Sequence, residues 1–183
     1  PVVTRAHDVS TESVLSLEPT VVLAQTDTGP PEALDQIRAA GIPVVVLDMP
    51  SSVDDITPRI RTVAEALGVP DAGEELVERT VQEIDDVRRA IPEGSVPRVA
   101  FLYLRGQAGV YLLGGEESGA DSMIAAAGGE DAGTAIGLDR PFTPITSEAM
   151  VEAAPDVILL TDSGLESVGG IDELLAMPGI AQT

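Results

Sequence analysis

The side chains best suited to chemistry in this sequence gather at the end of one short apolar run. Tyr103 and Arg105 stand two positions apart where the run Val99 to Leu104 ends, and such a run is typical of a buried β-strand. Residues two apart on a strand share one face of the sheet. In a parallel α/β sheet ligands gather at the carboxyl ends of the strands, and Gly106 follows at once. We therefore expect the pair to face a cleft.

The chemistry of this pair favours a metal-linked ligand. A guanidinium beside a phenol stabilises the ionised phenolate. A phenolate is a hard anionic oxygen that suits ferric iron, and tyrosine is one of the side chains that hold haem iron. The alternative is a buried strand tyrosine beside an arginine that reaches for surface acids. The two residues alone leave both interpretations open.

The only histidine, His7, lies in the loop Arg5-Ala6-His7-Asp8. Its imidazole suits a metal ligand or an acid–base group, and the alternative is a solvent-facing side chain or a local cap. There is no cysteine and no Gly-x-Ser-x-Gly elbow, so the usual nucleophiles of hydrolases are missing. We therefore expect a protein that is not an enzyme.

The composition excludes further classes of function. Acids outnumber bases by 31 to 10, every base is an arginine, and the formal net charge is −21. Such a surface repels phosphate backbones, so we expect no nucleic-acid partner. The absence of lysine removes P-loop and Schiff-base chemistry. No apolar run reaches the length of a transmembrane helix, so we expect no direct membrane span.

The pattern along the chain predicts an α/β fold with two lobes. Two short β-branched runs, Val21 to Ala24 and Val44 to Asp48, flank a helical stretch from Pro31 to Ala40, which is the order of a βαβ unit. A helix follows at about 54–67, and the longest helical pattern covers about 72–91.

We expect parallel-rich central sheets in both lobes, joined by this single long α-helix. The predicted divisions are an N-terminal lobe at residues 1–69, an interlobe helix at 70–92 and a C-terminal lobe at 93–183. Both lobes look incomplete because a further strand is expected at each end, so the fold is expected to be truncated at both ends.

One short unit occurs in both halves of the chain. Ser10 and Thr146 each precede a short helical pattern with an acid in its first turn, Glu12 or Glu148, and each helix stops before a proline that opens a buried run. One explanation of both acids is that each stabilises the N-terminus of its helix. Their repetition also suits two lobes that dock onto a two-fold partner bearing arginines.

At this point the chain resembles a known family: the substrate-binding proteins of ABC importers for cobalamin, ferric siderophores and haem, whose two lobes are joined by one helix. Within it the resemblance is strongest to the haem-binding proteins of actinobacteria and related bacteria. It covers about Thr4 to Thr183. The motifs that carry it are Phe101-Leu102-Tyr103-Leu104-Arg105-Gly106, Tyr111-Leu112-Leu113-Gly114-Gly115, Gly119-Ala120-Asp121-Ser122, Phe142-Thr143-Pro144-Ile145-Thr146-Ser147-Glu148 and Gly164-Leu165-Glu166-Ser167-Val168-Gly169-Gly170.

The resemblance implies a role for each candidate residue. His7 and Tyr103 would bind haem iron from opposite faces, and Arg105 would hydrogen-bond the Tyr103 oxygen. Glu12 and Glu148 match the two acids that similar proteins present to arginines of the permease dimer. The family is usually longer at both ends and starts with a secretory signal, followed in Gram-positive members by a lipid-modified cysteine, which places it in the extracytoplasmic cell envelope.

The sequence therefore predicts a protein that captures ferric haem between two lobes and delivers it to an ABC importer. A cleft lined by aliphatic side chains can desolvate the large apolar disc of a tetrapyrrole. The nearest alternative is the same fold with a ferric siderophore or cobalamin as ligand. More distant alternatives are a chelatase-like α/β enzyme that uses His7 as acid or base, and a structural or regulatory module without a ligand.

Overall fold

The computed structural model describes residues 4–5, 8–177 and 179–181 of the 183-residue chain. It divides the chain into two compact units. The first comprises Pro1–Pro50 and Asp54–Glu83, and the second comprises Ser51–Val53 and Ile84–Thr183. The division falls inside the longest helix, α4 (Pro70–Ala90), which contributes residues to both units. The boundaries at 69/70 and 92/93 stay predictions.

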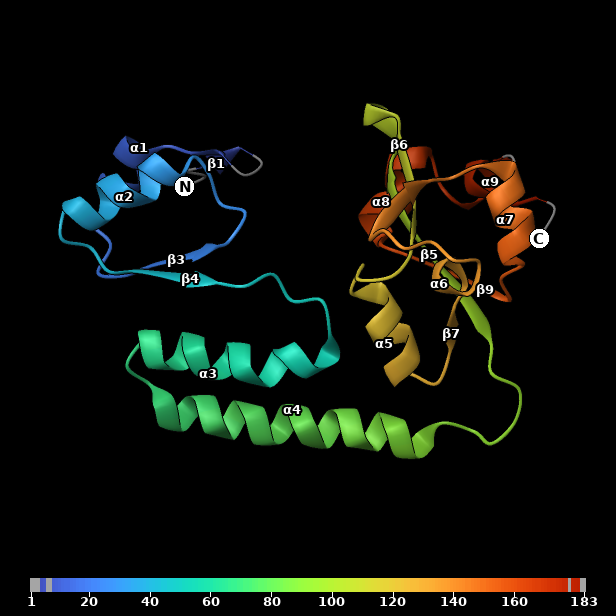
Figure 1. The fold of residues 1–183 in the computed structure, drawn as a ribbon, viewed down its shortest axis with the longest axis horizontal. Helices are drawn as coiled ribbons and strands as arrows, with labels where there is room; N and C mark the ends of the chain where they lie inside the picture. Colours follow the sequence, from blue (N-terminus) through green and yellow to red (C-terminus); the bar gives the residue numbers. More distant parts are fainter. Residues whose placement is uncertain (1–3, 6–7, 178, 182–183) are drawn as a thin grey trace. The chain divides into compact units, whose positions relative to one another are not determined.

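The first unit is built on a parallel pair of strands. β3 (Val22–Gln25) pairs with β4 (Val44–Leu47), and α2 (Pro31–Ala39) connects them, which confirms the βαβ unit. Helices lie on both sides of the pair: α1 (Thr11–Leu15) and α2 on one side, and α3 (Ile56–Ala66) on the other (Figure 1).

The remaining elements of the first unit are short. They are the antiparallel strands β1 (Thr4–Arg5) and β2 (Asp8–Val9) and the 3₁₀ turn η1 (Val53–Asp55), whose first residue is assigned to the second unit.

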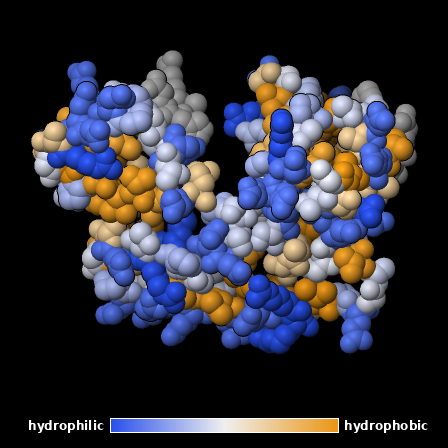
Figure 2. Space-filling view, in the orientation of Figure 1, coloured by the Kyte–Doolittle hydropathy of each residue, from blue (hydrophilic) through white to orange (hydrophobic). Residues whose placement is uncertain are grey.

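The core of the first unit is small and aliphatic. Its buried members are Val14, Ala24, Leu34 and Ile37. Outside it, hydrophobic residues gather over β3 and β4, where Leu23 and Val46 are exposed (Figure 2).

Helices α3 and α4 meet through small residues. Gly73 on α4 lies so close to Ala64 on α3 that an added Cβ would overlap the Ala64 side chain. The Arg61 guanidinium then reaches Glu74 through two hydrogen bonds, of 2.8 and 3.2 Å. Close approach of two helices requires small residues at the crossing, and these two positions supply them.

The second unit contains a five-stranded mixed sheet centred on β5 (Arg98–Arg105). β7 (Glu130–Asp131) and β9 (Val157–Leu160) pair with β5 in parallel, and β6 (Val110–Gly114) pairs with it antiparallel. β8 (Phe142–Pro144) pairs antiparallel with β6. The antiparallel pair β5–β6 arises because the chain reverses through the 3₁₀ turn η2 (Gly106–Ala108) and Gly109, whose φ is 65°.

Helices cover one face of this sheet. They are α6 (Ala132–Ala135), α7 (Ser147–Ala153), α8 (Asp162–Val168) and α9 (Ile171–Leu175), while α5 (Ala120–Ala126) packs beside β7. The core contains Ala100, Leu102 and Leu104 from β5 together with Leu113 and Met150. None of the helices in the described ranges is long and apolar enough to cross a membrane.

The repeated unit of the sequence is confirmed in both halves. Ser10 accepts a hydrogen bond from the Ser13 N–H (3.2 Å) at the start of α1, and Thr146 accepts one from the Ala149 N–H (3.1 Å) at the start of α7. Each helix leads into a parallel strand, β3 or β9. Helix α8 and strand β6 were not predicted from the sequence, because each contains a glycine, which lowers the propensity for regular structure.

Candidate functional site

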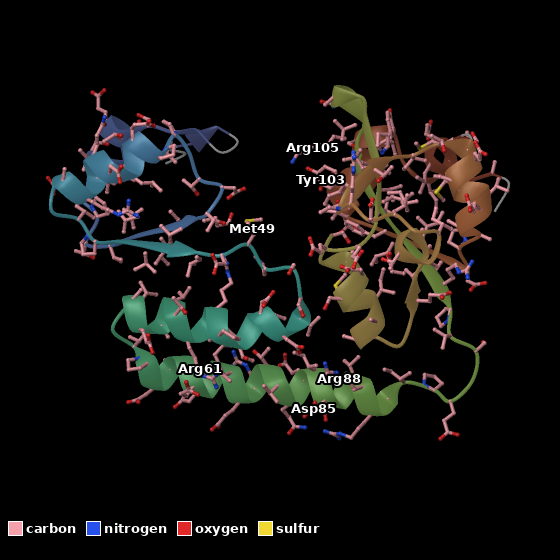
Figure 3. All side chains as sticks on the ribbon, in the orientation of Figure 1. Met49, Arg61, Asp85, Arg88, Tyr103 and Arg105 are labelled. Carbon is pink, nitrogen blue, oxygen red and sulfur yellow. The ribbon has the colours of Figure 1, made fainter. Side chains whose placement is uncertain are left out.

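Tyr103 and Arg105 share the face of β5 that the helices leave uncovered. Burial alternates along the strand: Ala100, Leu102 and Leu104 are buried, while Tyr103 is half-buried and Arg105 is exposed. This alternation follows from the two-residue period of a strand and confirms that the pair points away from the core. Both side chains project from the end of β5 (Figure 3).

The two side chains are in contact. The guanidinium carbon of Arg105 lies over the Tyr103 ring, 5.2 Å from its centroid. This is within the range of a cation–π interaction. The hydrogen bond expected from Arg105 to the Tyr103 oxygen is not among the contacts of the described residues, where the guanidinium stacks on the ring instead.

Two phenylalanines extend this contact into a row of rings. Phe142 lies 5.7 Å from Tyr103 and 6.3 Å from Phe101, measured between ring centroids. The row forms because Gly114, which pairs with Phe142, has no side chain, and a Cβ there would come within 3.2 Å of the Phe101 ring. Three of the four aromatic residues therefore gather on one sheet face, a set that sequence reasoning missed because β8 was not expected.

The chain is held tightly where β5 ends. The Gly106 N–H donates a hydrogen bond of 2.9 Å to the Ser167 hydroxyl on α8. A Cβ on Gly106 would overlap the Ser167 carbonyl, so this position requires glycine. Thr161 caps the start of α8: its hydroxyl accepts a hydrogen bond from the Gly164 N–H (3.1 Å). The sequence signals for this cap are the threonine itself and Asp162 in the first turn.

The other predicted site residues are His7, Glu12 and Glu148. His7 lies outside the described residues. Glu12 and Glu148 are exposed in the first turns of α1 and α7, in equivalent positions of the repeat, and they belong to different units. In the described ranges no three His, Cys, Asp or Glu side chains come together as a metal site.

Arg61 on α3 and Glu74 on α4 form an exposed ion pair in the first unit. The hydrogen bond and charge of Glu74 raise the pKa of Arg61, and the hydrogen bond from Arg61 lowers the pKa of Glu74. Both side chains are exposed, and Figure 3 shows Arg61 on α3.

Two pockets open elsewhere on the described surface. One, of about 560 Å³, lies beside the start of α7 and is lined by Tyr111, Ser147 and Glu173 among others. The other, of about 480 Å³, is an apolar groove along α3 and α4 that includes Ile60, Leu67 and Leu76. Tyr103 and Arg105 line neither pocket.

Comparison with known proteins identifies the family. The chain matches the family described as "Periplasmic binding protein" over residues 1–183. The chain belongs to this family. The resemblance seen in the sequence is thereby confirmed, and the α/β fold with it. The members of this periplasmic binding protein family are substrate-binding transport proteins, not enzymes.

Solved structures of this periplasmic binding protein family resemble the chain closely. The periplasmic heme-binding protein RhuT of Roseiflexus sp. RS-1, in apo form, is 45% identical with a TM-score of 0.89, over 96% of this chain and 66% of RhuT. The heme-binding protein HmuT is 38% identical with a TM-score of 0.86, over 100% of this chain and 60% of HmuT. Other solved forms of HmuT have alanine in place of one histidine, one tyrosine or one arginine.

A curated relative binds another ligand. The vitamin B12-binding protein of Yersinia pestis (strain Pestoides F) is 26% identical over 171 residues, which cover 87% of this chain and 54% of the relative. The chain thus spans about half the length of the curated relatives that it matches.

Proposed function

We propose that this chain is the ligand-binding part of an extracytoplasmic protein that captures ferric haem and delivers it to an ABC importer. The observation that carries the proposal is the Arg105 guanidinium over the Tyr103 ring on the uncovered face of β5. Tyrosine is one of the side chains that bind haem iron, and Arg105 places a positive charge beside it.

The surroundings of Tyr103 suit a flat apolar ligand. Phe142 and Phe101 continue the row of rings on the same sheet face, and Phe142 is exposed. Rings in such a row offer apolar surface and edges to a porphyrin, which is itself aromatic. Arg105 also supplies a positive charge that suits a haem propionate in a chain with a formal net charge of −21.

The comparisons support the same ligand. RhuT and HmuT are both named as heme-binding proteins. The tyrosine and arginine replaced in the HmuT variants stand two positions apart, which is the spacing of Tyr103 and Arg105. By the same analogy we propose His7 as the second axial ligand, on the opposite face of the haem from Tyr103, with the ligand held between the two lobes.

Delivery would use the two repeated acids. Glu12 and Glu148 are exposed, carry negative charge and occupy the same place in two equivalent helices. A permease dimer offers its arginines with two-fold symmetry, so one acid on each lobe matches one subunit. The finer location, in the periplasm or at a lipid-anchored cell surface, belongs to this proposal.

Cobalamin is the second candidate ligand, because the curated relative is a vitamin B12-binding protein.

A calorimetric titration of the chain with ferric haem, cyanocobalamin and a ferric siderophore separates the candidates. The proposal predicts saturable binding of haem that Tyr103→Phe weakens strongly. Binding of cyanocobalamin or a siderophore instead, unaffected by Tyr103→Phe, would replace haem by that ligand.

A further inference from the structure

The Ser167 hydroxyl holds the backbone at the residue that stacks on Tyr103. It accepts a hydrogen bond from the Gly106 N–H (2.9 Å) and donates to the Gly164 carbonyl within its own helix (2.7 Å). The Leu104 carbonyl lies 3.4 Å away as a second, weaker acceptor. One side chain on α8 therefore contacts the peptide groups on both sides of Arg105.

Because Ser167 holds the peptide group on each side of Arg105, it restrains the Cα of Arg105 and the direction in which the side chain leaves the strand. Arg105 has φ −137° and ψ 79°, and its ψ departs from the value of about 135° usual in an antiparallel strand. The ψ angle of a residue is set by where the next nitrogen lies, and the nitrogen after Arg105 is the Gly106 nitrogen that Ser167 binds. The bend at Arg105 is thus anchored to α8.

Further contacts hold α8 beside the end of β5. α8 follows β9, which pairs in parallel with β5, so the helix starts beside the strand that carries Tyr103. Gly164 and Ser167 stand three residues apart on one helix face, and a Cβ on Gly164 would lie 3.5 Å from the Leu104 carbonyl. Ser167 is half-buried, so the hydrogen bond from Gly106 is shielded from competing water.

We infer that Ser167 is a positioning residue of the ligand site: through the peptide groups on both sides of Arg105 it holds that residue in place, and through Arg105 it acts on the Tyr103 ring. The effect on haem rests on the proposed function. The effect of Ser167 on the position of Arg105 can be measured without a ligand. It adds a residue outside the tyrosine, arginine and histidine of the proposed site.

The test compares Ser167→Ala with Ser163→Ala. Ser163 lies on the same helix, and its hydroxyl pairs with the Thr161 hydroxyl (3.3 Å), so its loss leaves the end of β5 untouched. The first readout is the proton NMR shift of the Arg105 side chain in the ligand-free protein, which the Tyr103 ring current displaces. Ser167→Ala is expected to return this shift toward that of a free arginine, while Ser163→Ala leaves it unchanged.

The second readout is the rate of haem release, measured by transfer to apomyoglobin. Ser167→Ala is expected to speed release about two- to tenfold, the effect of one lost hydrogen bond. Ser167→Thr, which keeps the hydroxyl, is expected to restore the native rate.

In an Arg105→Leu background Ser167→Ala should have no further effect, because the residue through which it acts is gone. If Ser167→Ala does not fold, Ser167→Cys keeps the volume with a weaker hydrogen-bonding group and replaces it.

An unchanged Arg105 shift in Ser167→Ala, or effects of Ser167→Ala and Arg105→Leu that simply add, would overturn the inference. Failure of the proposed function has a different signature, namely no uptake of haem by the unmodified chain. The two results are distinguishable because the NMR shift is measured without haem.

Discussion

The guanidinium of Arg105 lies 5.2 Å from the centre of the Tyr103 ring, and the two side chains come from alternate positions on one strand. The two residues are close in sequence, so β5 and the turn that ends it determine the positions of both. The planar, permanently charged guanidinium lies over the ring and places a positive charge beside the proposed iron ligand. This geometry leads to the first prediction.

Replacing Arg105 should weaken haem binding without unfolding the protein. We expect Arg105→Leu to lower haem affinity roughly tenfold, the usual cost of losing a group that supports a metal ligand. Arg105→Lys should be intermediate, since it keeps the charge but loses the planar stack. Arg79→Leu, at an exposed position on α4, is the matched control. Equal affinities of Arg105→Leu and Arg79→Leu in a haem titration would remove Arg105 from the site.

Gly106 should tolerate no side chain. Its added Cβ would overlap the Ser167 carbonyl, so we expect Gly106→Ala to lower the free energy of unfolding by about 1–3 kcal/mol. Gly109→Asn is the control, because a Cβ at Gly109 meets no atom within 4 Å and asparagine accepts its positive φ. Urea unfolding of both variants measures the difference. A Gly106→Ala variant as stable as Gly109→Asn would mean that α8 can shift away from β5.

The fold could be predicted from the sequence where the patterns are strong. The alternation in β5 and the βαβ order of the first half come from runs of β-branched and apolar residues, and Tyr103 and Arg105 were placed on one face for the same reason. Helix α4 was predicted within two residues at its start and one at its end. Local signals were sufficient there.

Contacts between distant segments could not be predicted. The meeting of Phe142 with Tyr103 depends on the registers β5–β6 and β6–β8, and on the missing side chain of Gly114. The role of Ser167 depends on the packing of α8 against Gly106. Gly164 has a low helix propensity, and its place in α8 is explained by its close approach to the Leu104 carbonyl. Such pairings are tertiary and override propensity.

The two repeated acids should matter for transport and not for haem binding. We expect Glu12→Ala combined with Glu148→Ala to reduce stimulation of the permease ATPase at least tenfold, with haem affinity unchanged, because each lobe loses its charge partner. Glu32→Ala combined with Glu152→Ala removes two exposed acids from α2 and α7 as a control. Full stimulation by the first double variant in vesicles with the permease would show that docking uses other residues.

The ion pair between Arg61 and Glu74 should stabilise the protein only above the acid range. The hydrogen bond from Arg61 lowers the pKa of Glu74 in the folded protein from its usual value of 4.5. A carboxyl with a lowered folded pKa contributes stability above its unfolded pKa and loses that contribution as pH falls through the folded pKa.

Glu74→Gln should therefore lower the Tm slightly at pH 7, and the difference should shrink as the pH falls below the usual pKa of 4.5 and through the lower folded pKa. Glu75→Gln, the exposed neighbour, serves as the control. Thermal unfolding followed by circular dichroism measures all three proteins. A difference from the unmodified protein that persisted at low pH would assign the effect to packing and not to charge.

The central claim, that Tyr103 binds haem iron, is tested most directly by a visible-absorption titration with ferric haem. The chain offers a matched control, because Tyr111 is its only other tyrosine. We expect one saturating spectral change in the unmodified chain and in Tyr111→Phe, a different spectrum and an affinity lower by at least tenfold in Tyr103→Phe, and an altered spectrum in His7→Ala. Identical titrations of Tyr103→Phe and Tyr111→Phe would contradict the account.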